Sequence, residues 1–132
     1  NIYGNLQKDN SLISNIIKSF KNGNNLTVIN KNNKRDYLFI DDLINAIIKL
    51  IDYNCEFEIF NIGSGKSYSF ENIIQLFEKK TKNKIKRKYE TSKQNNISKT
   101  QADISKIKKE INWNPKYTLV EGIEKIILKN TK

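Results

Sequence analysis

The spacing of apolar residues along the chain predicts five helices. In five stretches apolar side chains recur every three or four residues, the spacing that places them on one helical face. The predicted helices span residues 11–20, 41–52, 69–77, 103–111 and 119–128. Residues suited to begin or end them flank these stretches: Ser11, Asp41 or Asp42, Ser69, Asp103 and Thr118 as amino-terminal caps, and Gly23 as a stop.

Between the helices lie short segments whose residues favour extended backbone. These are 26–29, 37–40, 57–60 and 85–89, where β-branched or aromatic residues are enriched or apolar and polar residues alternate. Helices and strands mixed in this way predict an α/β fold. Because the strands are few and short, we expect one small lobe over residues 1–132 that packs against something larger, rather than a complete doubly wound sheet.

The chain has 132 residues and carries a formal net charge of +10, from 24 Lys and Arg against 14 Asp and Glu. An excess of this kind can attract a polyanion. The basic residues are spread over presumed loops and helix faces, however, so we favour a solvated surface over a nucleic-acid interface. Residues 84–89, where Lys and Arg precede Tyr89, would be the place for such an interface. An edge strand protected by lysines is the commoner explanation.

The residue inventory excludes several kinds of chemistry. Cys55 is the only cysteine and there is no histidine. The chain therefore forms no intramolecular disulfide, and it supplies neither a Ser-His-Asp triad nor the commonest zinc ligand. No apolar run approaches the roughly 20 residues that cross a bilayer, and the first residues lack a signal pattern. We expect a soluble, cytoplasmic protein without a membrane partner.

Residues 61–67 place Gly63 and Gly65 between a predicted strand and a predicted helix. Glycines at such a position can let the backbone approach a phosphate. The spacing fits neither a P-loop nor a dinucleotide fingerprint, because one residue separates the two glycines and Tyr68 stands where a third glycine would fall. By spacing alone a structural turn is favoured over a phosphate cradle.

Two charged groups lie at the ends of the second predicted strand. Arg35 suits bidentate recognition of phosphate, whereas an Arg35–Asp36 surface pair explains the same residues equally well. Asp41 and Asp42 could form an acid–base or metal pair, but adjacent acids between a strand and a helix favour the role of helix cap.

Taken in order, the motifs resemble the extended short-chain dehydrogenase family, the NAD-dependent epimerases and dehydratases of nucleotide sugars. The similar segments are Asn1-Ile-Tyr-Gly4, Leu26-Thr-Val28, Arg35 to Asp42, Phe60-Asn-Ile-Gly63-Ser-Gly65, Ala102-Asp-Ile-Ser-Lys106, and Trp113-Asn-Pro115 with Leu119-Val-Glu-Gly122. They follow one another along nearly the whole chain in the family's order. The resemblance identifies the chain as a small carboxy-terminal substrate-binding lobe of a Rossmann-type enzyme.

The resemblance also assigns substrate-binding roles to individual residues. Asn1 matches the family's contact with the diphosphate-sugar region, Leu26 and Val28 match the strand beside the base, and Arg35 matches the diphosphate-binding arginine. A second basic contact falls near Lys93, where this chain reads Lys-Gln-Asn-Asn in place of the family's Arg-x-Gly-Asp. The resemblance implies no catalytic residue here, because the family's Tyr-x-x-x-Lys pair lies upstream of the segment that Asn1 begins.

For the protein as a whole, the resemblance implies a nucleoside-diphosphate sugar as substrate and NAD as cofactor. NAD would be bound by an amino-terminal Rossmann domain outside this chain, and the parent enzyme would be a homodimer. This chain alone is expected to be inactive. Two alternatives remain at this stage: a standalone basic nucleic-acid-binding module, and a purely structural lobe that binds no nucleotide.

Overall fold

The computed structural model describes residues 1–5, 7, 11–92 and 97–130. Within these residues it contains five helices and six short strands, as expected for an α/β lobe. In chain order the elements are β1 (Ile2–Tyr3), α1 (Leu12–Asn22), β2 (Leu26–Ile29), β3 (Lys34–Asp36), β4 (Leu38–Phe39), α2 (Ile40–Ile51), β5 (Ser67–Ser69), α3 (Phe70–Thr81), β6 (Arg87–Glu90), α4 (Ser105–Ile111) and α5 (Leu119–Asn130).

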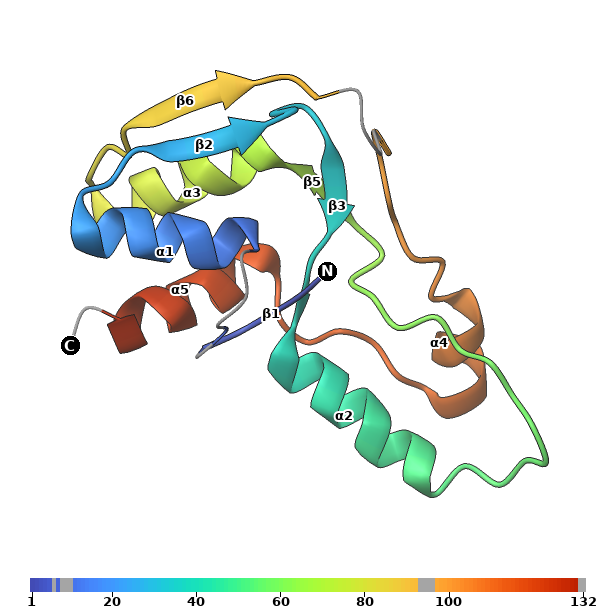
Figure 1. Cartoon of the computed structure of the whole chain (residues 1–132). Coiled ribbons are helices and arrows are strands. Elements are labelled where there is room, and N and C mark those ends of the chain that lie inside the picture. Colours follow the sequence, from blue (N-terminus) through green and yellow to red (C-terminus); the bar gives the residue numbers. More distant parts are fainter. Residues whose placement is uncertain (6, 8–10, 93–96, 131–132) are drawn as a thin grey trace.

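The strands pair two by two rather than in one sheet. β1 and β4 are parallel, β2 and β6 are parallel, and β3 and β5 are antiparallel. Figure 1 shows β2 and β6 lying over helices α1 and α3, with α5 beneath them, whereas α2 and α4 extend away from this group. The described chain therefore has a layered main body and a projecting part.

Each part has its own apolar interior. The main core, between the paired strands β2 and β6 and the helices α1, α3 and α5, consists of Tyr3, Ile13, Ile16, Leu26, Val28, Tyr37, Phe39, Ile73, Ile74, Phe77, Ile85, Leu119, Ile123 and Ile126. The small core, between β4, α2 and α4, consists of Leu38, Ala46, Ile107 and Trp113. Trp113 is 1% exposed and packs in the small core.

Several helix ends are those that the sequence predicts. The Ser11 side chain accepts a hydrogen bond from the Ser14 amide at 3.2 Å, and Gly23 ends α1 in the left-handed conformation with φ 68°. Ser69 and Asn72 form a reciprocal capping box at α3. Thr118 and Glu121 exchange hydrogen bonds in the same way at the start of α5. The predicted cap at Asp103 is wrong, because the residue before α4 is Ile104, which makes no side-chain cap, and Asp103 accepts a hydrogen bond from the Ser105 amide at 2.9 Å from one position earlier.

The predicted cap at Asp41 or Asp42 is wrong. The residue before α2 is Phe39, which makes no side-chain cap, and both acids lie in the first turn of the helix. The Asp42 carboxylate is 1% exposed and accepts hydrogen bonds from the amides of Lys116 and Tyr117, at 2.8 and 3.0 Å. Asp42 therefore fastens the segment before α5 to α2, a long-range role that a local pattern does not reveal.

Two of the predicted strands differ from the observed ones. Residues 37–40 divide between β4 and the start of α2, and residues 57–60 form no strand. Conversely, β1 and β5 are strands that the apolar pattern does not indicate, because each has only two or three residues and depends on a partner distant in sequence.

Gly122 brings α5 into contact with β1. A side chain at Gly122 would place its Cβ 2.1 Å from the Tyr3 hydroxyl oxygen and 3.1 Å from the Phe39 ring. Only glycine permits this approach, because heavy atoms do not come so close without displacement. The packing keeps β1, with Asn1 at its start, against the main core.

Candidate functional site

A hollow of about 280 Å³ opens where β1, the start of α1 and the start of α3 converge. Its lining comes from segments far apart in the sequence: Asn1, Ile2, Tyr3, Gln7, Ser11, Leu12, Ile13, Tyr37 and Phe70. Asn1 and Tyr37 are brought together because the Leu38 amide donates a hydrogen bond to the Asn1 carbonyl at 2.9 Å, in register with the β1–β4 pairing. The hollow combines apolar walls with a few polar groups, as ligand sites do.

Arg35, on β3, does not line this hollow itself but contacts Phe70, which does. Its guanidinium lies over the ring of Phe70, 5.6 Å from the ring centroid, and one of its nitrogens donates to the Lys34 carbonyl at 2.8 Å. Phe70 is held at this place because its amide donates to the Asn33 carbonyl at 3.2 Å. None of the ion pairs formed within the described residues involves Arg35. The guanidinium is therefore oriented but not neutralised.

The alternative of an Arg35–Asp36 surface pair is not what the structure contains. The Asp36 side chain is 5% exposed and binds backbone amides instead. One carboxylate oxygen accepts from the Ser64 amide at 2.7 Å, and the other accepts from Gly65 at 3.0 Å and Ala102 at 3.1 Å. Asp36 thus anchors two loops on one side of β3 while Arg35 is directed elsewhere, as alternation along a strand requires.

Tyr37 contributes a buried hydroxyl to the hollow. The residue is 5% exposed, and its hydroxyl completes no hydrogen bond of normal geometry among the described residues, although Asn1 lies close enough to act on its pKa. Burial raises the pKa of Tyr37 to about 12, with Arg35 acting in the opposite direction. The phenol therefore remains protonated at neutral pH, and it offers a hydrogen bond that a buried polar group normally makes.

The other predicted site residues lie in different surroundings. Asn1 is exposed and lines the hollow together with Tyr37. Leu26 and Val28 are 4% and 1% exposed on β2, and their side chains belong to the main core. A ligand beside β2 would therefore meet main-chain atoms rather than these two side chains. Lys93 lies outside the described residues.

The glycine turn at 63–65 does not fit the pyrophosphate of NAD. A pyrophosphate is held by free backbone amides at such turns, but here the amides of Ser64 and Gly65 are donated to Asp36. Added to Gly63, a Cβ would lie 2.4 Å from the Cβ of Ala102. The glycine therefore serves close packing of two loops, and the prediction of a structural turn is confirmed.

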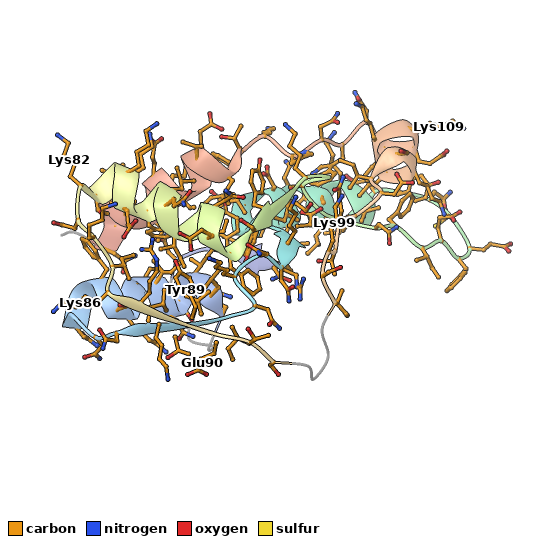
Figure 2. All side chains as sticks on the ribbon, turned by 90° about the horizontal axis from the view of Figure 1, so that it is seen from above. Lys82, Lys86, Tyr89, Glu90, Lys99 and Lys109 are labelled. Atoms are coloured by element: carbon orange, nitrogen blue, oxygen red, sulfur yellow. The ribbon has the colours of Figure 1, made fainter. Side chains whose placement is uncertain are left out.

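Residues 84–89 do not present a free stacking surface. The Tyr89 hydroxyl donates to Glu71 at 2.6 Å, and the Lys31 ammonium lies over its ring, 4.7 Å from the centroid. Arg87 is paired with Glu78 at 2.6 Å and with Glu71 at 3.1 Å. Figure 2 shows Lys82 and Lys86 at one end of the molecule, Lys109 at the other and Lys99 between them. The labelled basic groups are scattered, as a solvated surface predicts.

Tyr37 and Phe70 line the hollow, and the sequence patterns did not single them out. Tyr37 stands within the Arg35-Asp36-Tyr37 run, so the run itself carried a signal that more than one of its residues faces the site. Phe70 offered no signal beyond its place at the start of a helix. Within the described residues, no cluster of acidic residues or cysteine could hold a metal ion, and no helix is long and apolar enough to cross a membrane.

Comparison with known proteins gives the same family throughout. The family model described as GDP-mannose 4,6 dehydratase matches residues 1–126. An uncharacterised protein of Methanocaldococcus jannaschii is 30% identical over 125 residues, which are 94% of this chain and 38% of that protein. The UDP-glucuronate 4-epimerase of Thermodesulfobacterium geofontis is 35% identical over 94 residues, covering 70% of this chain and 29% of the relative.

A solved structure shares the fold over almost the entire chain. The UDP-glucuronic acid 4-epimerase of Bacillus cereus, in complex with UDP-glucuronic acid and NAD, superposes with a TM-score of 0.90 at 25% identity. The alignment covers 98% of this chain and 42% of that structure. This chain thus spans less than half the length of the relatives that it matches.

Proposed function

Since the chain belongs to the GDP-mannose 4,6 dehydratase family, we propose that it binds the diphosphate of a nucleotide sugar and orients the sugar for chemistry at an NAD cofactor held elsewhere. The observation that carries this proposal is the Arg35 guanidinium, which lies over the Phe70 ring at the edge of the hollow and has no ion-pair partner in the described chain. A planar guanidinium matches two phosphate oxygens at once, which is the geometry that a diphosphate requires.

The surroundings of Arg35 support the same ligand. Phe70 packs under the guanidinium, 5.6 Å from it, and a side chain that is already placed loses less freedom when a phosphate binds. The protonated Tyr37 hydroxyl supplies an uncharged donor at the wall of the hollow, and Asn1 supplies an exposed amide side chain next to it. Cation and donors together suit an anionic, oxygen-rich ligand.

The relatives support the reaction class. The Bacillus cereus structure holds UDP-glucuronic acid and NAD, and the Thermodesulfobacterium geofontis relative is a UDP-glucuronate 4-epimerase. In such an enzyme NAD supplies hydride transfer. The part proposed for this chain is binding and orientation: fixing the diphosphate fixes the position of the attached sugar, and correct placement is itself a large component of catalysis. The homodimer expected for the parent remains a prediction.

Calorimetric titration of the chain tests this function. UDP-glucuronic acid, GDP-mannose, a dTDP-sugar and inorganic pyrophosphate serve as ligands for the wild type, Arg35→Ala and Arg35→Lys. We expect Arg35→Ala to weaken nucleotide-sugar binding about tenfold or more, because charge-assisted hydrogen bonds contribute about 1.5–3 kcal/mol. Arg35→Lys should restore only part of the affinity, since an ammonium cannot bind two oxygens in one plane.

Two further variants separate loss of a specific contact at the hollow from loss of net positive charge. Lys109→Ala removes one positive charge from exposed α4, away from the hollow, and should leave affinity unchanged if net charge alone is not responsible. Tyr37→Phe should weaken binding several-fold with little change in stability, because its hydroxyl completes no hydrogen bond of normal geometry within the described residues. Equal weakening by Arg35→Ala and Lys109→Ala, or no nucleotide binding at all, would contradict the proposal and favour a structural lobe.

A further inference from the structure

The two contacts that orient the Arg35 guanidinium depend on segments from different parts of the chain. One contact is the ring of Phe70, which directly follows β5, the strand that pairs with β3. The other is the Lys34 carbonyl, which accepts a hydrogen bond from the guanidinium at 2.8 Å. The same carbonyl also accepts the Thr100 amide at 3.0 Å, from residues 98–100 on the other side of β3. The orientation of Arg35 therefore depends on both neighbours of β3.

The Asp36 carboxylate fastens both of these neighbours to β3. One of its oxygens accepts the Ser64 amide at 2.7 Å and the Ser64 hydroxyl at 2.6 Å, just before β5. The other oxygen accepts the amide of Gly65 at 3.0 Å and that of Ala102 at 3.1 Å, just after residues 98–100. Hydrogen bonds to a charged acceptor are stronger than neutral ones, and several on one buried group hold it firmly. Asp36 thus joins three segments at one point.

The two loops around Asp36 are also packed and cross-linked. A Cβ added to Gly63 would lie 2.9 Å from a carboxylate oxygen of Asp36, so only glycine lets the loop close over this group. At the surface the Gln101 side-chain amide donates to the Gly65 carbonyl at 2.9 Å, which ties the same two loops together. The loops therefore form one unit around the carboxylate.

Charge alone gives no reason for an acid next to Arg35. A carboxylate near a phosphate site repels the ligand. Among the described residues no ion pair joins Asp36 to Arg35. The hydrogen bonds that the carboxylate accepts come instead from the two loops. A contribution of Asp36 to binding would consequently be geometric.

We propose that Asp36 is a positioning residue, whose carboxylate fixes the two segments beside β3 and thereby orients the Arg35 guanidinium for the diphosphate. This role rests on the proposed function, in which Arg35 binds the phosphates. A side chain held in its binding conformation loses less freedom when the ligand arrives, and one immobilised side chain of this size accounts for about a three- to tenfold change in affinity.

The first test is the sign of the effect of Asp36→Asn. The asparagine replaces one acceptor oxygen with an N–H donor, so at least one of the loop amides loses its acceptor. We expect calorimetric titration to show about three- to tenfold weaker binding of UDP-glucuronic acid and of inorganic pyrophosphate. Removing a negative charge without any loss of geometry would strengthen the binding of both anions, so unchanged or tighter binding overturns the proposal.

Asp42→Asn is the matched control. Asp42 is also a buried acid, 1% exposed, that accepts two backbone amides, but it holds the segment before α5 rather than the neighbours of β3. This variant should lower stability and leave affinity at the wild-type value. Circular dichroism fixes a temperature at which each variant is folded. Should Asp36→Asn not fold, Ser64→Ala removes one hydrogen bond to Asp36, and it should weaken binding about twofold.

A double-mutant cycle separates positioning from a general structural role. If Asp36 acts through Arg35, adding Asp36→Asn to Arg35→Ala should not weaken pyrophosphate binding further, because there is no guanidinium left to orient. The stability losses of the two substitutions should still add. Additive losses of affinity would show that Asp36 does not act through Arg35, and would overturn the proposal.

Nuclear magnetic resonance of the unliganded chain provides a readout that does not require ligand binding. The Arg35 Nε–Hε signal should move and broaden in Asp36→Asn, and remain at its wild-type position in Asp42→Asn. An unchanged signal in Asp36→Asn contradicts the positioning role. The proposed function fails separately, when Arg35→Ala leaves nucleotide-sugar affinity unchanged. Weakening by Arg35→Ala together with wild-type affinity of Asp36→Asn would retain the function and remove only the role of Asp36.

Discussion

The main core and the small core differ in how completely this chain encloses them. Around the main core, the large apolar residues that α1, α3 and α5 leave exposed are Val120 and Leu128, both on α5, and the buried acid Glu78 is paired with Arg87. Around the small core, α2 turns four isoleucines outward. The difference teaches that two apolar interiors of one fold can be enclosed to different degrees, and that the exposure of the apolar residues around them distinguishes the two.

The largest effect should come from a cavity in the main core. Ile123 is 0% exposed on α5, and Ile123→Ala should lower the free energy of unfolding by about 3 kcal/mol, through lost apolar contact and an unfilled void. Leu128→Ala on the same helix is the control, because Leu128 is 66% exposed. It should change stability by less than about 0.5 kcal/mol in urea denaturation. Similar losses for the two variants would show that the main core is not closed.

A smaller effect on stability is expected at Asp42, which joins α2 to the segment before α5. Asp42→Ala removes the acceptor of the Lys116 and Tyr117 amides, so we expect a loss of about 2 kcal/mol. Asp41→Ala is a matched control one residue away. Asp41 is half-exposed and lies 3.6 Å from the Lys125 ammonium, an ion pair that contributes less than about 0.5 kcal/mol. Equal effects in thermal denaturation would contradict the anchoring role of Asp42.

The third prediction concerns how stability depends on pH through the Glu78–Arg87 ion pair beside the main core. Burial by itself raises the pKa of Glu78, but hydrogen bonds from the Ile85 amide and from Arg87 outweigh it and hold the pKa below its usual value. The stabilisation is therefore fully present above the ordinary pKa of about 4.3 and is lost as pH falls through the lower, folded-state value.

The pH dependence can be measured by comparing the stability of the wild type with that of Glu78→Gln. At pH 7 the variant should be less stable by about 1.5 kcal/mol. The difference from the wild type should shrink as the pH falls from 5 toward 3 in urea denaturation. A constant difference over this range would show that the Glu78 charge contributes nothing.

Local sequence patterns were sufficient for the elements that local interactions determine. The five helices follow from apolar spacing, and Ser11, Gly23, Ser69 and Thr118 begin or end them as predicted. The pattern failed where the outcome depends on distant partners. Asp42 looked like a cap because its true partners lie more than 70 residues away. Residues 57–60 alternate apolar and polar side chains as a strand does. In the described chain they form no strand, and the apolar residues Phe57 and Ile59 are exposed.

The residues of the candidate site show the same difference between local and distant determinants. Arg35 and Asn1 could be predicted as candidates from the resemblance, since their motifs are contiguous in sequence. Tyr37 and Phe70 could not, because the hollow exists only after β1, α1 and α3 have packed together. Alternation along a strand indicates which side chains are buried, but it does not indicate which buried side chain borders a cavity.

The smallest effect on stability should come from the exposed isoleucines of α2. Ile51 is 75% exposed at the end of α2, so Ile51→Gln should change the unfolding free energy of the 132-residue chain by less than about 0.5 kcal/mol. The same substitution should reduce self-association in analytical ultracentrifugation, because exposed apolar area drives non-specific contact. A loss above about 1 kcal/mol in the isolated chain would mean that Ile51 already packs within it. The small core would then be as self-contained as the main core, and the comparison between the two would no longer hold.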